Sequence, residues 1–442
     1  MGQTLTEEYK TRDHHPTEKT SIGDNTSLRN CIGNQEDLFI FGTDNFSQFP
    51  RRDESIRSKC NRALAVARKD DIVVLRGNLD REYQRWLHSH GLGSENIVEY
   101  GIHSRQMTLS ELIVNDPAPI LAHLSPPLKK PVYVPWFSGQ KENEAAAILG
   151  ADLFGASKAA TIKYNDKASF KAICETLGIG VVDGHSFEIH GDDKNYRDFE
   201  EGITLYLLTT KTVIIRGTMG EAGMSLYKTQ GNDIKTIHRQ IVLSGEKTVI
   251  IEPFLDVHTS PNDQWVIGRD GTITHIGMCE QICERGMVYI GTLKGRSYSR
   301  TILEKVSRIS GKIVREMARS GYRGVIGIDY IITDEGIFPI ENNARFNGSS
   351  YAGMIVENIR EKLKSPLPFW KLLKTKTNKC SFPELANRME SILYDGKKTD
   401  CVFPYDCKAL SESGNFAVIL LAEDMDQITF MEKSLNDMGI QR

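Results

Sequence analysis

The first hundred residues alternate between short apolar strands and helical stretches, and this alternation constrains the fold more than any other feature of the sequence. The expected strands and helices follow one another at Leu38–Phe41, 54–68, Ile72–Leu75, 81–90 and Ile97–Tyr100. Strands that alternate with helices pack as a parallel sheet covered by helices. The sequence therefore predicts an α/β protein that begins with a Rossmann-like domain over residues 36–130.

The segments around this domain have compositions of their own. Residues 1–35 are polar, and we expect them to form a flexible N-terminal arm. The Pro-rich stretch Pro126–Pro131 is typical of a linker. The turn Gly42-Thr43-Asp44-Asn45 lacks the full glycine fingerprint of a dinucleotide site, so we expect no bound dinucleotide. A chain of 442 residues is too long for one ordinary core, which indicates two or three domains.

The middle of the chain is rich in strands. Five expected strands lie between residues 213 and 276, a density that favours an antiparallel lid and the start of a second sheet. A long amphipathic helix is expected over residues 301–319. The two apolar runs Val325–Thr333 and Ile337–Glu341 then predict a hairpin around Asp334-Glu335-Gly336.

This hairpin carries the most informative polar residues. Asp329 interrupts an apolar strand and Glu341 ends its partner, so antiparallel pairing brings both carboxylates to the same end. Charged groups are seldom buried unless they are paired or bound to metal. With the amide oxygen of Asn343 they make a set of hard oxygen ligands suited to Mg²⁺. Arg345 could balance charge on a transferred phosphoryl group. The alternative is an ion-paired hairpin end with Arg345 as the partner.

Three earlier segments could complete a nucleotide site. Lys167 precedes a helix and could reach phosphates. The loop after Arg216 contains Gly217, Gly220 and Gly223, which would let backbone amides approach phosphates closely.

The third segment ends a strand and contains Glu252, Leu255 and Asp256. A carboxylate there, with the backbone of Leu255, could read the edge of an adenine ring. Taken singly, each of the three segments also has a simpler interpretation: a solvated lysine, a hairpin loop, and a strand end before a Pro turn.

In this order the segments resemble the ATP-grasp superfamily, over about residues 150–355, and the run Ile340-Glu-Asn-Asn-Ala-Arg345 is the most specific match. The resemblance implies an ATP-grasp fold behind a pre-ATP-grasp Rossmann-like domain. It also implies a linker and helical segment (131–186), a lid (187–255) and a catalytic domain with a C-terminal extension (256–442). The family places a second phosphate-binding lysine where this chain has Arg216; Lys228 could share that role. The N-terminal unit and the tail Val402–Asp406 are similar to a narrower group, the peptide ligases of natural-product pathways such as the pheganomycin peptide ligase and the butirosin glutamate–carrier-protein ligase.

The resemblance implies an ADP-forming ligase with ATP and Mg²⁺ as cofactors. A carboxylate would be activated as an acyl phosphate and joined to an amine acceptor. Arg285 or Arg296 would bind the substrate carboxylate, with Glu280, Gln281 and Tyr289 as further candidates on the substrate side. The alternatives are transfer to the thiol of an acyl-carrier protein and a non-catalytic nucleotide-binding protein. A biotin-dependent carboxylase is disfavoured because no biotin-carrier segment follows residue 355.

Composition limits the partners that we expect. The formal net charge of −3 and the absence of a polybasic stretch argue against nucleic acid. No apolar run approaches the roughly 20 residues that span a bilayer, so we expect no membrane partner and a cytoplasmic location. Because the family often dimerises, the resemblance also implies a possible homodimer.

Overall fold

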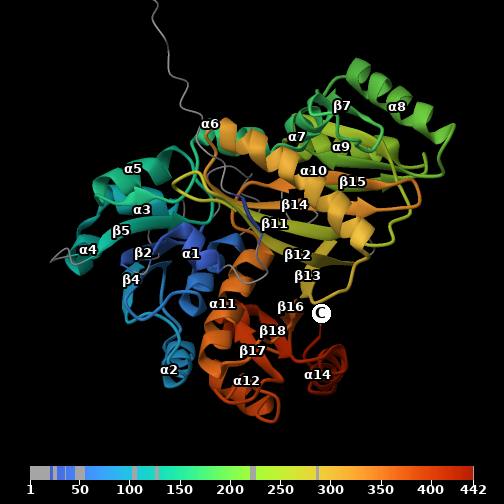
Figure 1. Ribbon diagram of the computed structural model, residues 1–442. Helices are drawn as coiled ribbons and strands as arrows, with labels where there is room; N and C mark the ends of the chain where they lie inside the picture. Colours follow the sequence, from blue (N-terminus) through green and yellow to red (C-terminus); the bar gives the residue numbers. More distant parts are fainter. Residues whose placement is uncertain are drawn as a thin grey trace, which may run out of the picture.

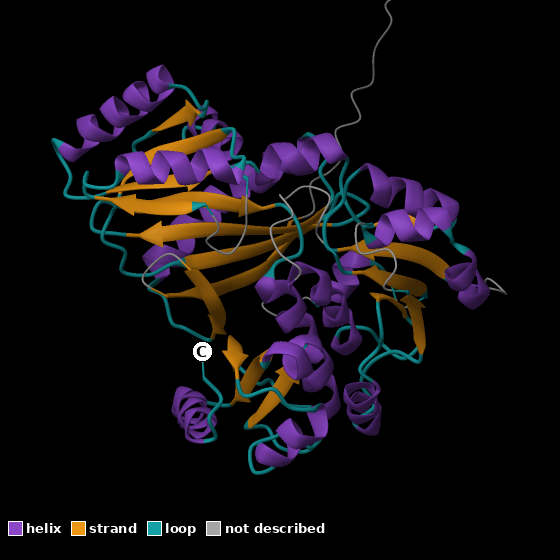
Figure 2. Ribbon diagram, turned by 180° about the vertical axis from the view of Figure 1, so that it is seen from behind, coloured by secondary structure: helices purple, strands orange, loops and turns teal. Residues whose placement is uncertain are grey.

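The computed structural model describes residues 20–22, 27–34, 36–44, 55–101, 107–124, 129–219, 225–284 and 288–441. Its strands form three sheets, which Figure 1 shows as separate layers and Figure 2 shows from behind. Within the described part of the chain, no helix combines the length and the apolar character that crossing a bilayer would need.

The first sheet is entirely parallel, as predicted for a Rossmann-like unit. Its order is β4-β3-β2-β5-β6. The strands are β2 (Asp37–Gly42), β3 (Ile72–Arg76), β4 (Asn96–Tyr100), β5 (Lys130–Pro135) and β6 (Asp152–Leu153). The segments between and beside them are η1 (Ser55–Ala65), α2 (Arg81–Ser89), α3 (Leu109–Asn115), α4 (Ala118–Leu121), η3 (Ala122–Leu124) and α5 (Gln140–Ile148).

Two predicted boundaries in this region are wrong. The sheet continues past residue 130, because β5 pairs along its whole length with β2. Pro131, which the sequence predicts to lie in a linker, is the second residue of β5, a position near the start of a strand where proline is tolerated. The predicted arm is also partly ordered: β1 (Thr20–Ile22) pairs with β12 (Ile273–Glu284), and α1 (Leu28–Ile32) buries both of its terminal side chains. The remainder of the arm, residues 1–19, 23–26 and 35, lies outside the described residues.

A small four-stranded sheet, which we call the lid sheet, follows. Its order is β7-β10-β8-β9, all antiparallel. Its elements are β7 (His185–Glu188), α8 (Asp193–Leu207), β8 (Val213–Gly217), β9 (Leu226–Thr229), α9 (Ile234–Ser244) and β10 (Thr248–Pro253). Isoleucines, valines and one phenylalanine of these elements form a separate core between the sheet and its two helices. Helices α6 (Lys158–Asn165) and α7 (Lys167–Thr176) connect this unit to the first sheet.

The largest sheet has the order β15-β14-β11-β12-β13-β16-β18-β17, with β1 added beside β12. Its remaining strands are β11 (Pro261–Ile267), β13 (Val288–Lys294), β14 (Gly324–Ile332), β15 (Ile337–Asn343), β16 (Phe369–Lys376), β17 (Cys401–Tyr405) and β18 (Asn415–Ala422). Its helical elements are α10 (Arg300–Arg319), α11 (Gly348–Leu363), α12 (Phe382–Arg388), η4 (Cys407–Ala409), α13 (Leu410–Ser413) and α14 (Met425–Asp437). Figure 1 shows α10 crossing in front of β11, β14 and β15.

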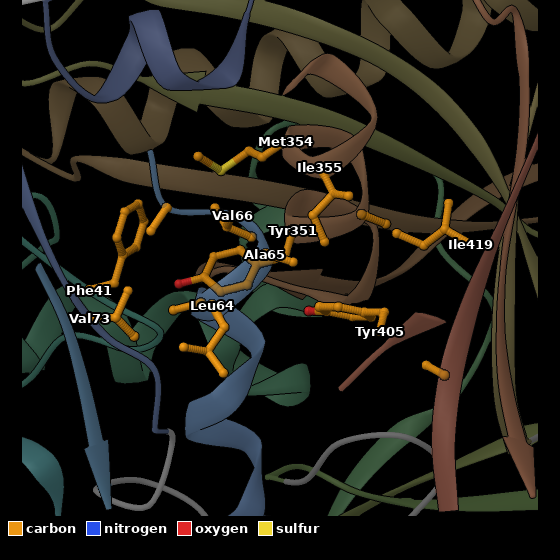
Figure 3. Packing of buried hydrophobic residues seen from close by; sticks show 14 of the residues in the cluster. Phe41, Leu64, Ala65, Val66, Val73, Tyr351, Met354, Ile355, Tyr405 and Ile419 are labelled. Carbon is orange, nitrogen blue, oxygen red and sulfur yellow. The ribbon is translucent and has the colours of Figure 1, made fainter. Parts of the chain in front are cut away.

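The two ends of the chain share one hydrophobic core. Side chains of β2, β3 and η1 pack with those of α11, β17 and β18, and Figure 3 shows Phe41 and Leu64 beside Tyr351 and Tyr405. The Tyr83 hydroxyl, which is buried, donates a hydrogen bond of 2.9 Å to the carbonyl of Pro404. The C-terminal extension therefore packs against the N-terminal domain as part of the same core.

Candidate active site

A large cavity of about 1270 Å³ is lined by residues from all three sheets. Arg216 and Glu252 come from the lid sheet, Asp329 and Glu341 from the largest sheet, and Trp136 from the carboxyl end of β5. Ligands of parallel α/β sheets bind beyond the carboxyl ends of the strands. The cavity exceeds the usual pocket of roughly 300–1,000 Å³ for one small ligand, so it has room for more than one reactant.

The hairpin of β14 and β15 brings Asp329 and Glu341 together. The two residues face each other across the strands, and the register shifts immediately afterwards, between Asp329 and Tyr330. Both side chains line the cavity, and Asp329 is buried. Burial, and then the negative charge of Glu341, raises the pKa of Asp329. Two carboxylates this close together repel each other, and a cation between or beside them would stabilise their charged forms.

Amide groups surround Asp329. Asn343 Nδ2 donates to Asp329 Oδ2 at 2.9 Å, and Asn262 Nδ2 donates to the other carboxylate oxygen. Among the described residues, no group of three or more His, Cys, Asp and Glu side chains could hold a metal ion. The donor set at this position is instead two carboxylates and one amide. This set suits Mg²⁺, which takes few protein ligands and keeps waters and substrate phosphates as the others.

Basic side chains lie on the same side of the hairpin. Lys167 begins α7, and its backbone N–H donates to the carbonyl of Thr218 at 3.0 Å. Its ammonium lies 3.3 Å from a carboxylate oxygen of Glu341. Arg345 lines the cavity and donates a hydrogen bond to the side chain of Asn165. The simple interpretation of Lys167 as a solvated lysine does not hold, because its side chain is 7% exposed.

The lid sheet contributes a buried network centred on Glu252. Arg216 Nε donates to one oxygen of Glu252 at 2.9 Å, and the Lys171 ammonium lies 2.8 Å from the other. Arg216 Nη1 also donates to the carbonyl of Ile340 on β15 at 2.9 Å. Arg216 therefore joins the lid sheet to the strand that carries Glu341. Lys171 was missed from the sequence, although its spacing of four residues from Lys167 places both on one helix face.

The two candidates for the second phosphate-binding cation differ in position. Arg216 is buried and lines the cavity. Lys228 is exposed and lies over the ring of Phe254, 3.5 Å from its centroid. Phe254 lines the cavity, whereas Lys228 is not part of the lining.

The other predicted ATP-binding residues also differ in whether they line the cavity. Leu255 lines the cavity together with Glu252, whereas Asp256 is exposed and lies away from it. A Cβ added to Gly217 would lie 2.6 Å from Ser225 Cβ, so this glycine allows the base of the loop to close. Gly220 and Gly223 lie outside the described residues.

Glu280, one of the predicted substrate-side residues, is held by three polar side chains. The Thr259 hydroxyl donates to Glu280 at 2.6 Å, the Tyr298 hydroxyl also donates to it, and Arg296 Nη1 lies 3.2 Å away. Glu280, Gln281 and Tyr289 line the cavity, whereas Arg296 stands outside its lining. Arg285 lies outside the described residues.

The cavity is also lined by basic residues that the sequence does not single out. Its lining includes basic residues of the N-terminal domain, of β16 and of the C-terminal extension: Arg62, Arg76, Lys374, Lys376 and Lys408. No local pattern marks these residues, because they come together only when the two ends of the chain pack. Their positions suit the binding of reactants beyond the carboxylate pair.

Comparisons with known proteins agree with this arrangement. The family model "L-aspartate–L-methionine ligase, ATP grasp" matches residues 206–343, which contain the lid network and both carboxylates. A search of curated proteins found no match.

Solved structures share the fold over nearly the whole chain. Biotin carboxylase from Campylobacter jejuni has a TM-score of 0.58 at 15% identity and covers 92% of each chain. N5-carboxyaminoimidazole synthetase from Staphylococcus aureus has a TM-score of 0.56 at 12% identity and covers 93% of this chain and 99% of its own. The biotin carboxylase domain of 2-oxoglutarate carboxylase from Hydrogenobacter thermophilus has a TM-score of 0.58 at 12% identity and covers 91% of this chain and 89% of its own.

The predicted ATP-grasp fold is therefore confirmed. The narrower similarity to peptide ligases of natural-product pathways stays a prediction. In the segment that carries Asp329 and Glu341 the chain is similar to the ATP-grasp family of L-aspartate–L-methionine ligase, and over nearly its whole length it shares the fold of the solved structures.

Proposed function

We propose that the protein is an ATP-dependent carboxylate–amine ligase that forms an amide or peptide bond through an acyl phosphate. The observation that carries the proposal is the pair of facing carboxylates, Asp329 and Glu341, in a cavity that is also lined by Lys167, Arg216 and Arg345. Phosphoryl transfer requires carboxylates that can hold Mg²⁺ and cationic side chains that can bind phosphates, and both are present here.

ATP and Mg²⁺ are the cofactors that fit this site. The Campylobacter biotin carboxylase is described with a β,γ-ATP compound, the Staphylococcus synthetase with ADP, and the Hydrogenobacter domain with MgADP. In this chain Asp329, Glu341 and Asn343 would hold Mg²⁺, which would neutralise charge on the phosphates. Leu255 and the end of β10 would bind the adenine edge, while Lys167 and Arg216 would bind phosphate oxygens.

The reaction has two steps, and each balances without a covalent enzyme intermediate. In the first, an oxygen of the donor carboxylate attacks the γ-phosphorus, the bond to the β,γ-bridging oxygen breaks, and ADP leaves. In the second, the acceptor nitrogen attacks the carbonyl carbon and the acyl C–O bond breaks. Phosphate leaves with the electron pair of that bond. An ammonium acceptor gives up two protons, one to the departing phosphate and one to solvent. Arg345 would stabilise the charge that develops on the transferred group.

An amine is preferred over a thiol as the acceptor. The matched family is named for a ligase of two amino acids. The biotin carboxylases share the fold at 15% identity or less, which carries no information on the substrate.

The test is ADP release by the purified protein with ATP, Mg²⁺ and pools of amino acids. We expect release that depends on a particular acid, with an amide product detected by mass spectrometry of the same mixture. Acid-dependent turnover without an amide product would favour a thiol acceptor. Absence of both turnover and Mg·ATP binding would refute the ligase proposal.

Arg216→Ala is expected to weaken Mg·ATP binding about 10- to 100-fold, because hydrogen bonds to charged groups contribute about 1.5–3 kcal/mol. Lys228→Ala, the matched control on the neighbouring strand, should leave the dissociation constant within about twofold, since Lys228 lies behind Phe254. Isothermal titration with a non-hydrolysable ATP analogue measures both constants. Equal losses in the two variants would contradict the assignment of the phosphate-binding role to Arg216.

A further inference from the structure

The cavity lining contains an ion pair between residues 344 positions apart in the chain. Arg62 lies on η1 of the N-terminal domain and Asp406 follows β17 in the C-terminal extension. Arg62 Nε and Asp406 Oδ2 are 2.8 Å apart, and the two side chains are 16% and 18% exposed. Both residues line the cavity.

Joining the two ends of the chain does not account for this pair. The Tyr83 hydroxyl and the Lys408 ammonium already bind backbone carbonyls across the same boundary, at Pro404 and Asn78. A hydrophobic core joins the same elements. Asp406 also has a left-handed backbone, with φ 53° and ψ 47°, and such conformations in residues other than glycine collect at functional sites.

The pair lines the same cavity as the proposed reaction centre, whose Asp329 and Glu341 are also part of the lining. The Arg62 guanidinium lies 5.2 Å from the centroid of the ring of Trp136, another lining residue. A reactant held by Arg62 and Asp406 would therefore share one cavity with the carboxylates proposed to hold Mg²⁺.

We propose that Arg62 and Asp406 form the acceptor subsite and that the acceptor is an α-amino acid. Arg62 binds the α-carboxylate, for which a guanidinium offers a fork of donors. Asp406 binds the α-ammonium group and holds its nitrogen toward the acyl phosphate. Before the acceptor binds, the two side chains neutralise each other. This inference rests on the proposed function, because it assigns the second reactant of that reaction.

The test compares two acceptors that differ in what Arg62 and Asp406 can recognise. Hydroxylamine traps an acyl phosphate as a hydroxamate and has neither a carboxylate nor an ammonium group to bind. The second acceptor is the L-amino acid that supports amide formation in the amino-acid pools, and its carboxamide serves as a version without the carboxylate. The variants are Arg62→Gln and Asp406→Asn, since Asn also tolerates a left-handed backbone.

We expect both variants to form hydroxamate within about twofold of the wild-type rate. With the amino acid, kcat/KM should fall roughly 10- to 100-fold, mainly through KM, as expected for the loss of a charged hydrogen bond. Arg62→Gln should also lose the preference of the wild type for the amino acid over its carboxamide. Asp406→Asn should retain that preference.

Tyr83→Phe is the matched control, because it removes a hydrogen bond between the same two segments without touching the cavity lining. It should lower the thermal unfolding midpoint and leave the ratio of amide to hydroxamate unchanged. If Arg62→Gln lowers amide and hydroxamate equally, the pair is structural and the proposal is wrong; unchanged amide kinetics would overturn it as well. A wild-type protein that gives no hydroxamate with any acid would refute the proposed function itself, and the acceptor subsite with it.

Discussion

Glu341→Gln is expected to lower ADP release about 100- to 1000-fold without lowering the thermal unfolding midpoint. The loss follows from removing one of the two charges that face the proposed metal position, since a preorganised group that stabilises a transition state contributes about 2.7–4 kcal/mol. The unfolding midpoint should hold because the variant removes the repulsion between Glu341 and Asp329 across β14 and β15, and this gain offsets the loss of the ion pair between Glu341 and Lys167. In the variant, Asp329 is the one carboxylate that is left of the facing pair.

The matched control lies in the turn of the same hairpin. Asp334 has a side chain that is 90% exposed and lies within hydrogen-bonding distance of the His258 ring. Asp334→Asn should retain full turnover. Coupled-enzyme detection of ADP gives the rates, and differential scanning fluorimetry gives the midpoints. Comparable turnover by Glu341→Gln and wild type would exclude this carboxylate from the reaction.

Glu252→Gln is expected to reduce the free energy of local unfolding of the lid sheet by about 3–5 kcal/mol, provided that the opening exposes Lys171 and Arg216 to solvent. Glu252 accepts from both cations, whose side chains are 10% and 8% exposed. Removing one partner of a buried ion pair leaves an uncompensated charge, which is strongly destabilising. The loss should appear as faster amide exchange in β8 and β10, because these strands carry Arg216 and Glu252.

Glu188→Gln is the control, since Glu188 lies on β7 of the same sheet with a side chain that is 81% exposed. Native-state hydrogen exchange with mass spectrometry compares the two variants peptide by peptide. We expect no change in the lid peptides of Glu188→Gln, because exposed ion pairs contribute little. Protection of β8 and β10 that is unaffected by Glu252→Gln would mean that the network does not hold the lid sheet.

Local patterns predicted much of the fold. The pattern of apolar residues located β2, β3 and β4 of the first sheet, and the Asp334–Gly336 turn set the hairpin that brings Asp329 and Glu341 together. Composition was less reliable. Pro131 suggested a linker but lies in β5, and the polar surroundings of Leu28 and Ile32 hid two core residues.

Long-range contacts account for most of what was missed in the site. Lys171 meets Glu252 across 81 positions and Arg62 meets Asp406 across 344, and neither pairing leaves a local mark in the sequence. The same reason left Arg216 and Lys228 undecided. Their positions on neighbouring strands are predictable, but which of them faces the cavity depends on how the lid sheet packs against β15.

The core shared by the two ends of the chain restricts how the protein can fold while it is being synthesised. Phe41, Leu64 and Val73 emerge from the ribosome long before Tyr351 and Tyr405, the side chains that cover them. The N-terminal sheet therefore spends most of translation with an apolar face exposed, a state that favours aggregation and binding by chaperones. Slow translation of the second half would prolong that exposure. The yield of native protein should therefore depend strongly on the elongation rate, whereas the stability of the folded protein should not.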